Sequence, residues 1–140
     1  MFAGEIHYSR IPVEYWEHRI QMVKALGLNA LSIYIMWNYH EISKGNFDYS
    51  TENKNLSLFL DLAEKYDLKV LIRPGPYICA EWDFGGLPAR LLSINGLVIR
   101  ANNNLFLDEV KIYFESLAPI LKKHINSKEN PKGSIVLLQI

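Results

Sequence analysis

The chain has 140 residues, which is enough for one packed domain. Apolar residues make up 49% of it, a fraction too high for a disordered chain. Fifteen basic and fifteen acidic side chains give a net charge of zero, so we expect neither nucleic acid nor a membrane surface as a partner. One cysteine excludes a disulfide within the chain, and no apolar run reaches the roughly 20 residues of a membrane helix. No secretory leader is visible, which makes a cytoplasmic location the default expectation.

The first part of the chain alternates apolar runs with helical spacing. Residues 3–8 predict a short strand, and Pro12 stands where a helix can begin. Apolar positions then recur at helical spacing until Gly27, a typical helix stop. The nearly continuous apolar run 28–37 is typical of a strand covered on both faces, and the polar residues 40–53 predict a loop.

The alternation continues with a second helix. Its apolar face is made by Leu56, Phe59, Leu60, Ala63 and Tyr66. Residues 69–73 predict a third strand that Pro74 ends, and a loop rich in glycine and proline runs from there to about Leu91.

A strand or turn is predicted over residues 97–100, and a third helix follows with Asn104 as its candidate N-cap. Its expected buried stripe is Leu107, Val110, Phe114, Leu117 and Leu121. After a polar loop at 126–133, residues 134–140 predict a fourth strand. An apolar strand that ends bare at Ile140 leads us to expect that the sequence is cut there.

This β-α-β-α-β-α-β pattern predicts an α/β fold with a parallel sheet. Two architectures remain open: a doubly wound open sheet and half of an eight-stranded barrel. The glycine-rich dinucleotide fingerprint is missing after the first strand, and residues 85–88 lie in a loop that is no phosphate cradle. A nucleotide-binding enzyme is therefore a remote alternative.

Polar side chains gather where the predicted strands end, which is where α/β barrels place their active sites. Carboxylates, arginines and aromatic rings together suit a neutral polyhydroxylated substrate, because the rings stack on a sugar and the charged groups bind its hydroxyls. The candidates are His7, Ser9, Arg10, Tyr34, Trp37, Asn38, His40, Glu41, Arg73, Tyr77, Cys79, Glu81, Trp82 and Asp83.

Several of these residues also have a structural interpretation. Glu41 either serves the site or only pairs with Arg10 or Arg73. Trp37 and Trp82 either meet the substrate or pack the loops.

The histidines and the cysteine do not predict a metal site or a nucleophile. His7 and His40 have no partner at metal-ligand spacing, and Cys79 has no evident base, so a thiol lining a pocket is favoured. His18 and His124 fall on helices, where we expect them to be solvated.

Four sequence blocks resemble glycoside hydrolase family 35, the β-galactosidases, and the resemblance runs from residue 4 to residue 140. The most specific block is RPGPYICAEWDFGGLPA at 73–89, since 17 residues with this many Gly, Pro and Trp do not match by chance. The others are GEIHYSRIP at 4–12, KALGLNALSIYIMWNYHE at 24–41 and IVLLQI at 135–140.

This resemblance implies a TIM (β/α)8 barrel, of which residues 1–140 supply the first four strands and three helices. It implies hydrolysis of terminal non-reducing β-D-galactose residues with retention, by two glutamates about 5–5.5 Å apart. In the family pattern both glutamates fall beyond Ile140, so we expect this chain alone to be inactive. The alternative is a non-catalytic galactose-binding fragment or pseudoenzyme, which could self-associate through exposed barrel edges.

The resemblance also implies which residues bind the sugar. Tyr34, Cys79, Ala80 and Glu81 match the family's substrate-binding positions, with Arg10 and Trp37 as supports. Glu81 should stay ionised and pair with a nearby arginine. No catalytic residue, metal or cofactor is expected in the chain.

The chain departs from the family pattern at positions that flank the pocket. Ile35 and Met36 replace Val-Pro, Ile42 replaces a proline, and Arg90 replaces a tryptophan. The preference for a leaving group is therefore open.

Overall fold

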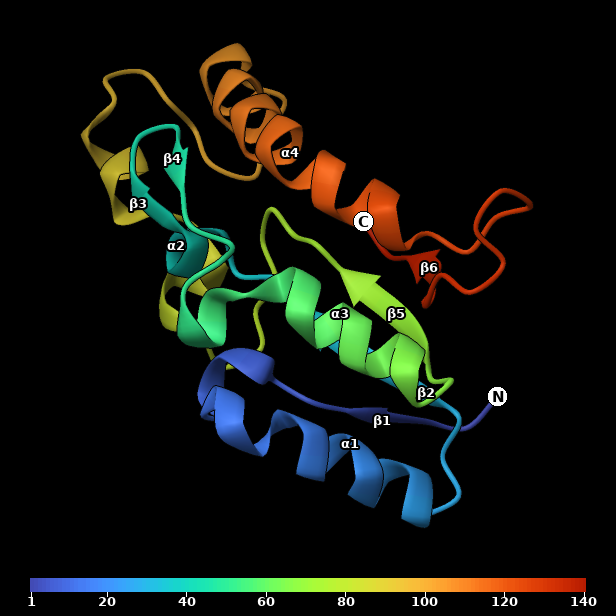
Figure 1. Cartoon of the computed structure of the whole chain (residues 1–140). Coiled ribbons are helices and arrows are strands. Elements are labelled where there is room, and N and C mark those ends of the chain that lie inside the picture. Colours follow the sequence, from blue (N-terminus) through green and yellow to red (C-terminus); the bar gives the residue numbers. More distant parts are fainter.

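A four-stranded parallel sheet forms the centre of the computed structural model, which describes residues 1–140 (Figure 1). Its strands lie in the order β1-β2-β5-β6 and are β1 (Ala3–Glu5), β2 (Ala30–Tyr34), β5 (Lys69–Arg73) and β6 (Ile135–Leu138). Three helices cover it: α1 (Trp16–Ala25), α3 (Leu56–Lys65) and α4 (Asn104–His124). The predicted α/β class and parallel sheet are confirmed.

The strand order separates the two architectures that the sequence left open. Neighbours in the sheet follow one another along the chain, whereas a doubly wound sheet reverses its order at a switch point. The helices also share one face, since all three contribute to a single core cluster with the strands (Figure 1). This arrangement is that of a partial barrel.

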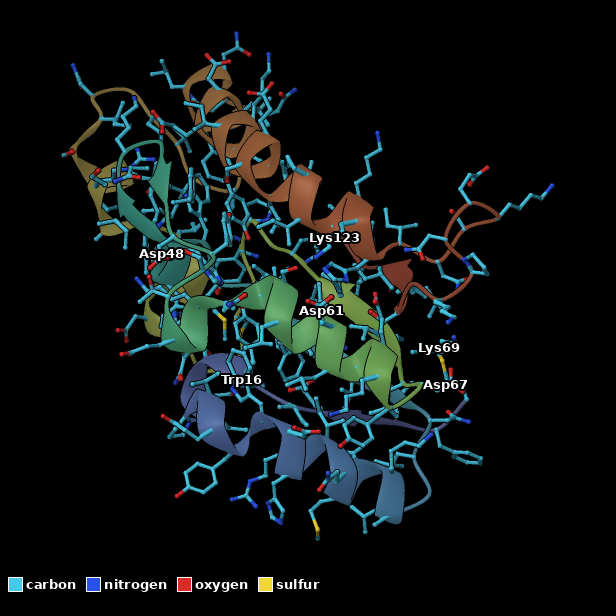
Figure 2. The ribbon with its side chains drawn as sticks, in the orientation of Figure 1. Trp16, Asp48, Asp61, Asp67, Lys69 and Lys123 are labelled. Atoms are coloured by element: carbon cyan, nitrogen blue, oxygen red, sulfur yellow. The ribbon has the colours of Figure 1, made fainter.

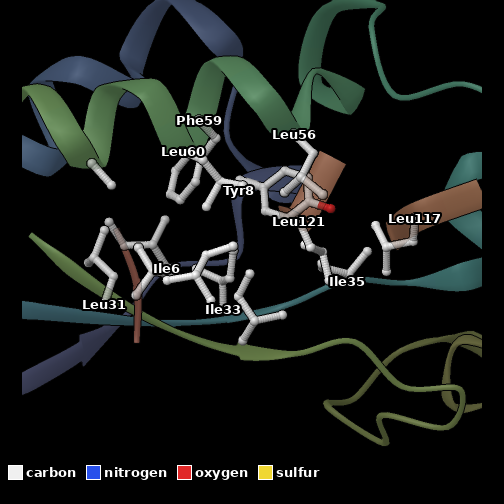
Figure 3. Packing of buried hydrophobic residues seen from close by; sticks show 14 of the residues in the cluster. Ile6, Tyr8, Leu31, Ile33, Ile35, Leu56, Phe59, Leu60, Leu117 and Leu121 are labelled. Atoms are coloured by element: carbon white, nitrogen blue, oxygen red, sulfur yellow. The ribbon is translucent and has the colours of Figure 1, made fainter. Parts of the chain in front are cut away.

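Side-chain alternation divides the sheet into an apolar and a polar face. Leu31 and Ile33 of β2 are fully buried under the helices, and Figure 3 shows both beneath Phe59 and Leu60 of α3. The alternate residues Ser32 and Tyr34 are only half-buried and lie on the opposite, concave face. The concave face of a barrel sheet is its interior, so polar residues there border the site.

Two segments differ from their predicted structure near the start of the chain. The strand predicted over residues 3–8 ends at Glu5, and Tyr8–Arg10 form a 3-10 turn. The helix expected from Pro12 is a 3-10 turn, Val13–Tyr15, followed by α1 from Trp16. The Trp16 indole donates hydrogen bonds to the carbonyls of Tyr8 (3.1 Å) and Ile11 (2.9 Å), which fixes the turn.

The loops also hold short elements that the sequence pattern did not reveal. The predicted loop 40–53 contains the end of α2 (Trp37–His40) and a hairpin of β3 (Glu41–Ser43) and β4 (Asn46–Phe47). Residues 97–100 form no strand.

The third helix is shifted from its prediction. Its N-cap is Asn103 rather than Asn104, because the Asn103 side chain accepts from the Phe106 N–H (3.1 Å). Leu107 is exposed, and His124, expected to be solvated, is 1% exposed. The buried face comprises Phe106, Glu109, Tyr113, Leu117, Leu121 and His124. Because Glu109 and His124 on that face are polar, the face does not show the apolar period from which a helix is predicted. No helix has the length and apolar character to cross a membrane.

Phe59 should contribute most of the packing between α3 and the start of the chain. Its ring centroid lies 5.5 Å from that of Tyr8 and 5.3 Å from that of Trp16. We expect Phe59→Ala to lower the free energy of unfolding by about 3–5 kcal/mol in urea titration, since it leaves a buried cavity. The neighbouring Leu58, which is 38% exposed, is the control: Leu58→Ala should cost clearly less, about 1 kcal/mol. Equal losses would contradict this assignment of the core.

Candidate functional site

Arg73 organises the polar concave face at the carboxyl end of β5. Its guanidinium donates to the Tyr34 hydroxyl, lies 4.9 Å from the Tyr34 ring centroid and donates through Nε to Gln139 Oε1 (2.9 Å). Glu5 Oε2 lies 3.7 Å from Arg73 Nη1, and Glu5 Oε1 is 2.7 Å from His7 Nε2. Because the Tyr34 oxygen accepts from Arg73, its own O–H remains available to donate to a ligand.

These residues border a cavity of about 250 Å³ that opens beside the strand ends. This volume is slightly below the range of typical ligand pockets. The lining residues are Tyr34, Arg73, Gly75, Tyr77, Ile78, Gln139 and Ile140. Tyr34, Arg73 and Tyr77 were predicted at the strand ends, whereas Gln139 was not, although its alternation with Leu138 along the last strand indicates the same face.

The loop after β5 has an unusual backbone at the predicted sugar-binding residues. Cys79, Ala80 and Glu81 have successive φ values of 63°, 51° and 47°, in the left-handed region that costs a non-glycine residue roughly 1–2 kcal/mol. Arg10 Nη2 donates to the carbonyls of Ala80 (3.2 Å) and Glu81 (2.8 Å). The Arg10 guanidinium also lies 5.2 Å from the Trp82 ring centroid, so one side chain holds the whole strained turn.

A second tie fixes this loop to the segment after β2. The Trp82 indole donates to Asn38 Oδ1 (2.8 Å), and the Asn38 amide donates to the Asp83 carbonyl (3.0 Å). Trp82 is therefore a loop-packing residue, one of the two roles that the sequence left open.

Of the predicted sugar-binding residues only Tyr34 lines the cavity, whereas Cys79, Ala80 and Glu81 follow its lining residue Ile78 in the adjoining turn. Tyr34 packs against the small buried cluster that contains Ala80, whereas Cys79 and Glu81 are exposed. The predicted pairing of Glu81 with an arginine is wrong for its carboxylate, because Arg10 binds its carbonyl instead. The Glu81 carboxylate has no protein partner, which leaves it free for a ligand.

The Glu41 side chain does not line the cavity beside the strand ends. It pairs with neither Arg10 nor Arg73 but with Arg90, which contacts both carboxylate oxygens (Nη2–Oε1 2.6 Å, Nε–Oε2 2.9 Å). The structural interpretation of Glu41 is confirmed, although the predicted partner was wrong. The residues lie 49 positions apart, and no local pattern reveals such a pair.

The same arginine neutralises a second buried carboxylate. Arg90 Nη1 lies 2.7 Å from Glu109 Oε2, and Lys44 Nζ lies 2.6 Å from Glu109 Oε1. Burial works to raise the pKa of Glu109, but the two cations hold it below its usual value. This network connects the β3 hairpin, the loop after β5 and α4.

Trp37 and His40 are buried and support the residues of the site through contacts in the core. Trp37 stacks on Tyr113 with centroids 5.0 Å apart, and the Tyr113 hydroxyl donates to the Pro74 carbonyl (2.7 Å) where the loop begins. His40 is fully buried, with Nε2 2.6 Å from the Tyr8 hydroxyl. Neither side chain is accessible to a substrate.

Comparisons with known proteins agree on one family. The model of Glycosyl hydrolases family 35 matches residues 1–140. The chain is 41% identical over 140 residues to human "Beta-galactosidase-1-like protein 2", covering 100% of this chain and 21% of that protein. It is 41% identical over 138 residues to mouse "Beta-galactosidase", covering 99% and 21%. The chain thus spans about a fifth of the length of these relatives.

A solved structure supports the fold. The crystal structure of GH5_18 from Bifidobacterium longum superposes with a TM-score of 0.61 at 12% identity, covering 97% of this chain and 37% of that one. At this identity the likeness concerns architecture alone.

His40 should make the fold sensitive to acid. Burial lowers its pKa from 6.5 to about 4, so the unfolded chain takes up a proton in this range that the folded chain does not. Stability is therefore full above pH 6.5 and falls by about 3 kcal/mol as the pH drops to 4. We expect His40→Asn to flatten this part of the urea-derived stability profile, while His18→Gln, at an exposed position, keeps it. An unchanged slope in His40→Asn would contradict the assignment.

Proposed function

Because the chain belongs to glycosyl hydrolase family 35, we propose that residues 1–140 form the galactose-recognition part of a retaining β-galactosidase. In this proposal β1, β2, β5 and β6 are the first four strands of its (β/α)8 barrel. The observation that carries the proposal is the packing of Tyr34 against the small buried cluster that contains Ala80 of the strained turn 79–81. The names of the curated relatives support a β-galactoside as the substrate.

Each proposed contact uses a group that the protein itself leaves available. The Tyr34 hydroxyl accepts from Arg73 and donates its proton to a sugar oxygen. The exposed Glu81 carboxylate accepts from sugar hydroxyls, while Ala80 contributes its backbone and the exposed Cys79 lies next to it in the turn. These three residues are consecutive in the left-handed turn.

The carboxylates at the strand ends do not supply the catalytic pair. Retention requires two carboxyl groups about 5–5.5 Å apart, one as nucleophile and one as acid/base. Glu5 is engaged by His7 and Arg73, Glu81 is the proposed acceptor for sugar hydroxyls, and the family resemblance assigns the catalytic pair to positions beyond residue 140. We therefore place both catalytic glutamates outside residues 1–140, so that this polypeptide binds galactose without cleaving a glycosidic bond.

A polypeptide of residues 1–140 should not hydrolyse a chromogenic β-galactoside above the uncatalysed rate. The reason is that the family resemblance assigns both catalytic glutamates to positions beyond residue 140, so these residues lack the pair that retention requires. A continuous absorbance assay against a full-length family 35 enzyme at equal concentration measures this. Turnover within tenfold of that enzyme would show that the catalytic pair lies inside these residues.

Galactose binding should depend on Glu81. We expect Glu81→Ala to weaken galactose at least about tenfold in calorimetric titration, because it removes hydrogen bonds to a charged acceptor. Glu115→Ala, which removes an exposed carboxylate from α4, is the matched control and should leave the affinity unchanged. Equal affinities for both variants, or no saturable galactose binding by the wild-type chain, would refute the proposed recognition role.

A further inference from the structure

A second cluster of ionisable side chains lies on the outer layer of the fold, where α3 packs beside α4. Asp61 and Glu64 stand three residues apart on α3, and His124 is the last residue of α4. One oxygen or nitrogen atom from each lies within 4.8 Å of the others. Figure 2 shows Asp61 on α3 close to Lys123 on α4. The glycosidase mechanism proposed above uses none of these side chains.

The distances within this cluster fit a small divalent cation. His124 Nδ1 lies 2.8 Å from Glu64 Oε1 and 3.9 Å from Asp61 Oδ1. Two ligands of a tetrahedral zinc ion, each about 2.1 Å from the metal, are about 3.4 Å apart. The two separations from His124 lie on either side of that value, and all three ligand atoms lie within 4.8 Å of one another, so rotation of the two carboxylates would bring them to one ion.

The histidine is fixed in the orientation that a ligand needs. His124 is 1% exposed, and its Nδ1 faces the carboxylates while its Nε2 lies 2.9 Å from Ser57 Oγ. A metal-ligating histidine characteristically has such a partner on its other ring nitrogen. Glu64 is held in turn by the Ser134 backbone N–H (3.2 Å).

Asp61 lies on the solvent-exposed side of the cluster. It is half-exposed and accepts no hydrogen bond, so it can rotate toward an incoming ion. The competing charge is Lys123, whose Nζ lies 3.9 Å from Asp61 Oδ1 and donates to Ser57 Oγ (3.1 Å). Lys123 is largely exposed, so its side chain can leave when a cation arrives.

We propose that Asp61, Glu64 and His124 bind one zinc ion, with water as the fourth ligand, through the convergence of a buried imidazole and two carboxylates between α3 and α4. One nitrogen and two oxygen donors suit Zn²⁺ better than Mg²⁺, which prefers an all-oxygen shell. The ion joins α3 to α4, and Ser134, just before β6, donates to the Glu64 ligand. This inference stands independently of the proposed glycosidase function.

Isothermal titration of the metal-free chain with zinc chloride tests the site. We expect one ion per chain, a higher Tm with zinc, and little response to magnesium. Asp61→Asn should weaken zinc at least about tenfold and His124→Gln should abolish binding, whereas the exposed His18→Gln should bind as the wild type does. Lys123→Gln should bind more tightly, because the competing ammonium is gone.

Three results would overturn the proposal: no saturable zinc binding by the wild-type chain, unchanged affinity in Asp61→Asn, or loss of binding in His18→Gln. If His124→Gln does not fold, Asp61→Asn decides, because its position is half-exposed and tolerates the change. If Asp61, Glu64 and His124 only held the two helices together, Lys123→Gln would not bind zinc more tightly. Unchanged or weaker binding in that variant would count against the site.

Discussion

Parallel hydrogen bonding between strands that are also neighbours along the chain constrains the whole molecule. Each crossover must bring the chain back in the same direction, so α1, α3 and α4 cover one face and bury Leu31 and Ile33. The opposite face is left for polar side chains, and all carboxyl ends meet at one edge. The register that pairs Tyr34 with Arg73 places their side chains together on that face. The candidate site is thus a consequence of strand pairing.

The loops at that edge are held by polar contacts more than by apolar packing. Arg10 binds two carbonyls of the left-handed turn, and Arg90 joins Glu41 to Glu109. Removing one partner of a buried pair leaves an uncompensated charge, which is why such networks hold a loop in one position. A turn with three strained residues can persist because Arg10 holds it. The rigidity suits a site that must present a backbone and a carboxylate together.

Local patterns predicted the elements well and their tertiary relations poorly. The strand 69–73 was predicted to the residue, because its apolar run ends at a proline. The choice between a barrel and a doubly wound sheet depends on strand order, which no local pattern contains. Glu109 and His124 were missed because polar residues on a buried helix face find partners far away in the sequence. Within the candidate site, the strand-end rule located Tyr34 and the turn 79–81, but the network around Arg73 required the fold.

The central claim is that Tyr34 and the turn 79–81 form one galactose-binding surface on the concave side of the sheet. Amide chemical shifts of the ¹⁵N-labelled chain, followed during titration with galactose, test it most directly. The account predicts saturable shifts at Ala80, Glu81 and Trp82, with smaller ones near Tyr34 and none on the outer face of α4. Shifts confined to the outer helices, or none at any galactose concentration, would contradict it.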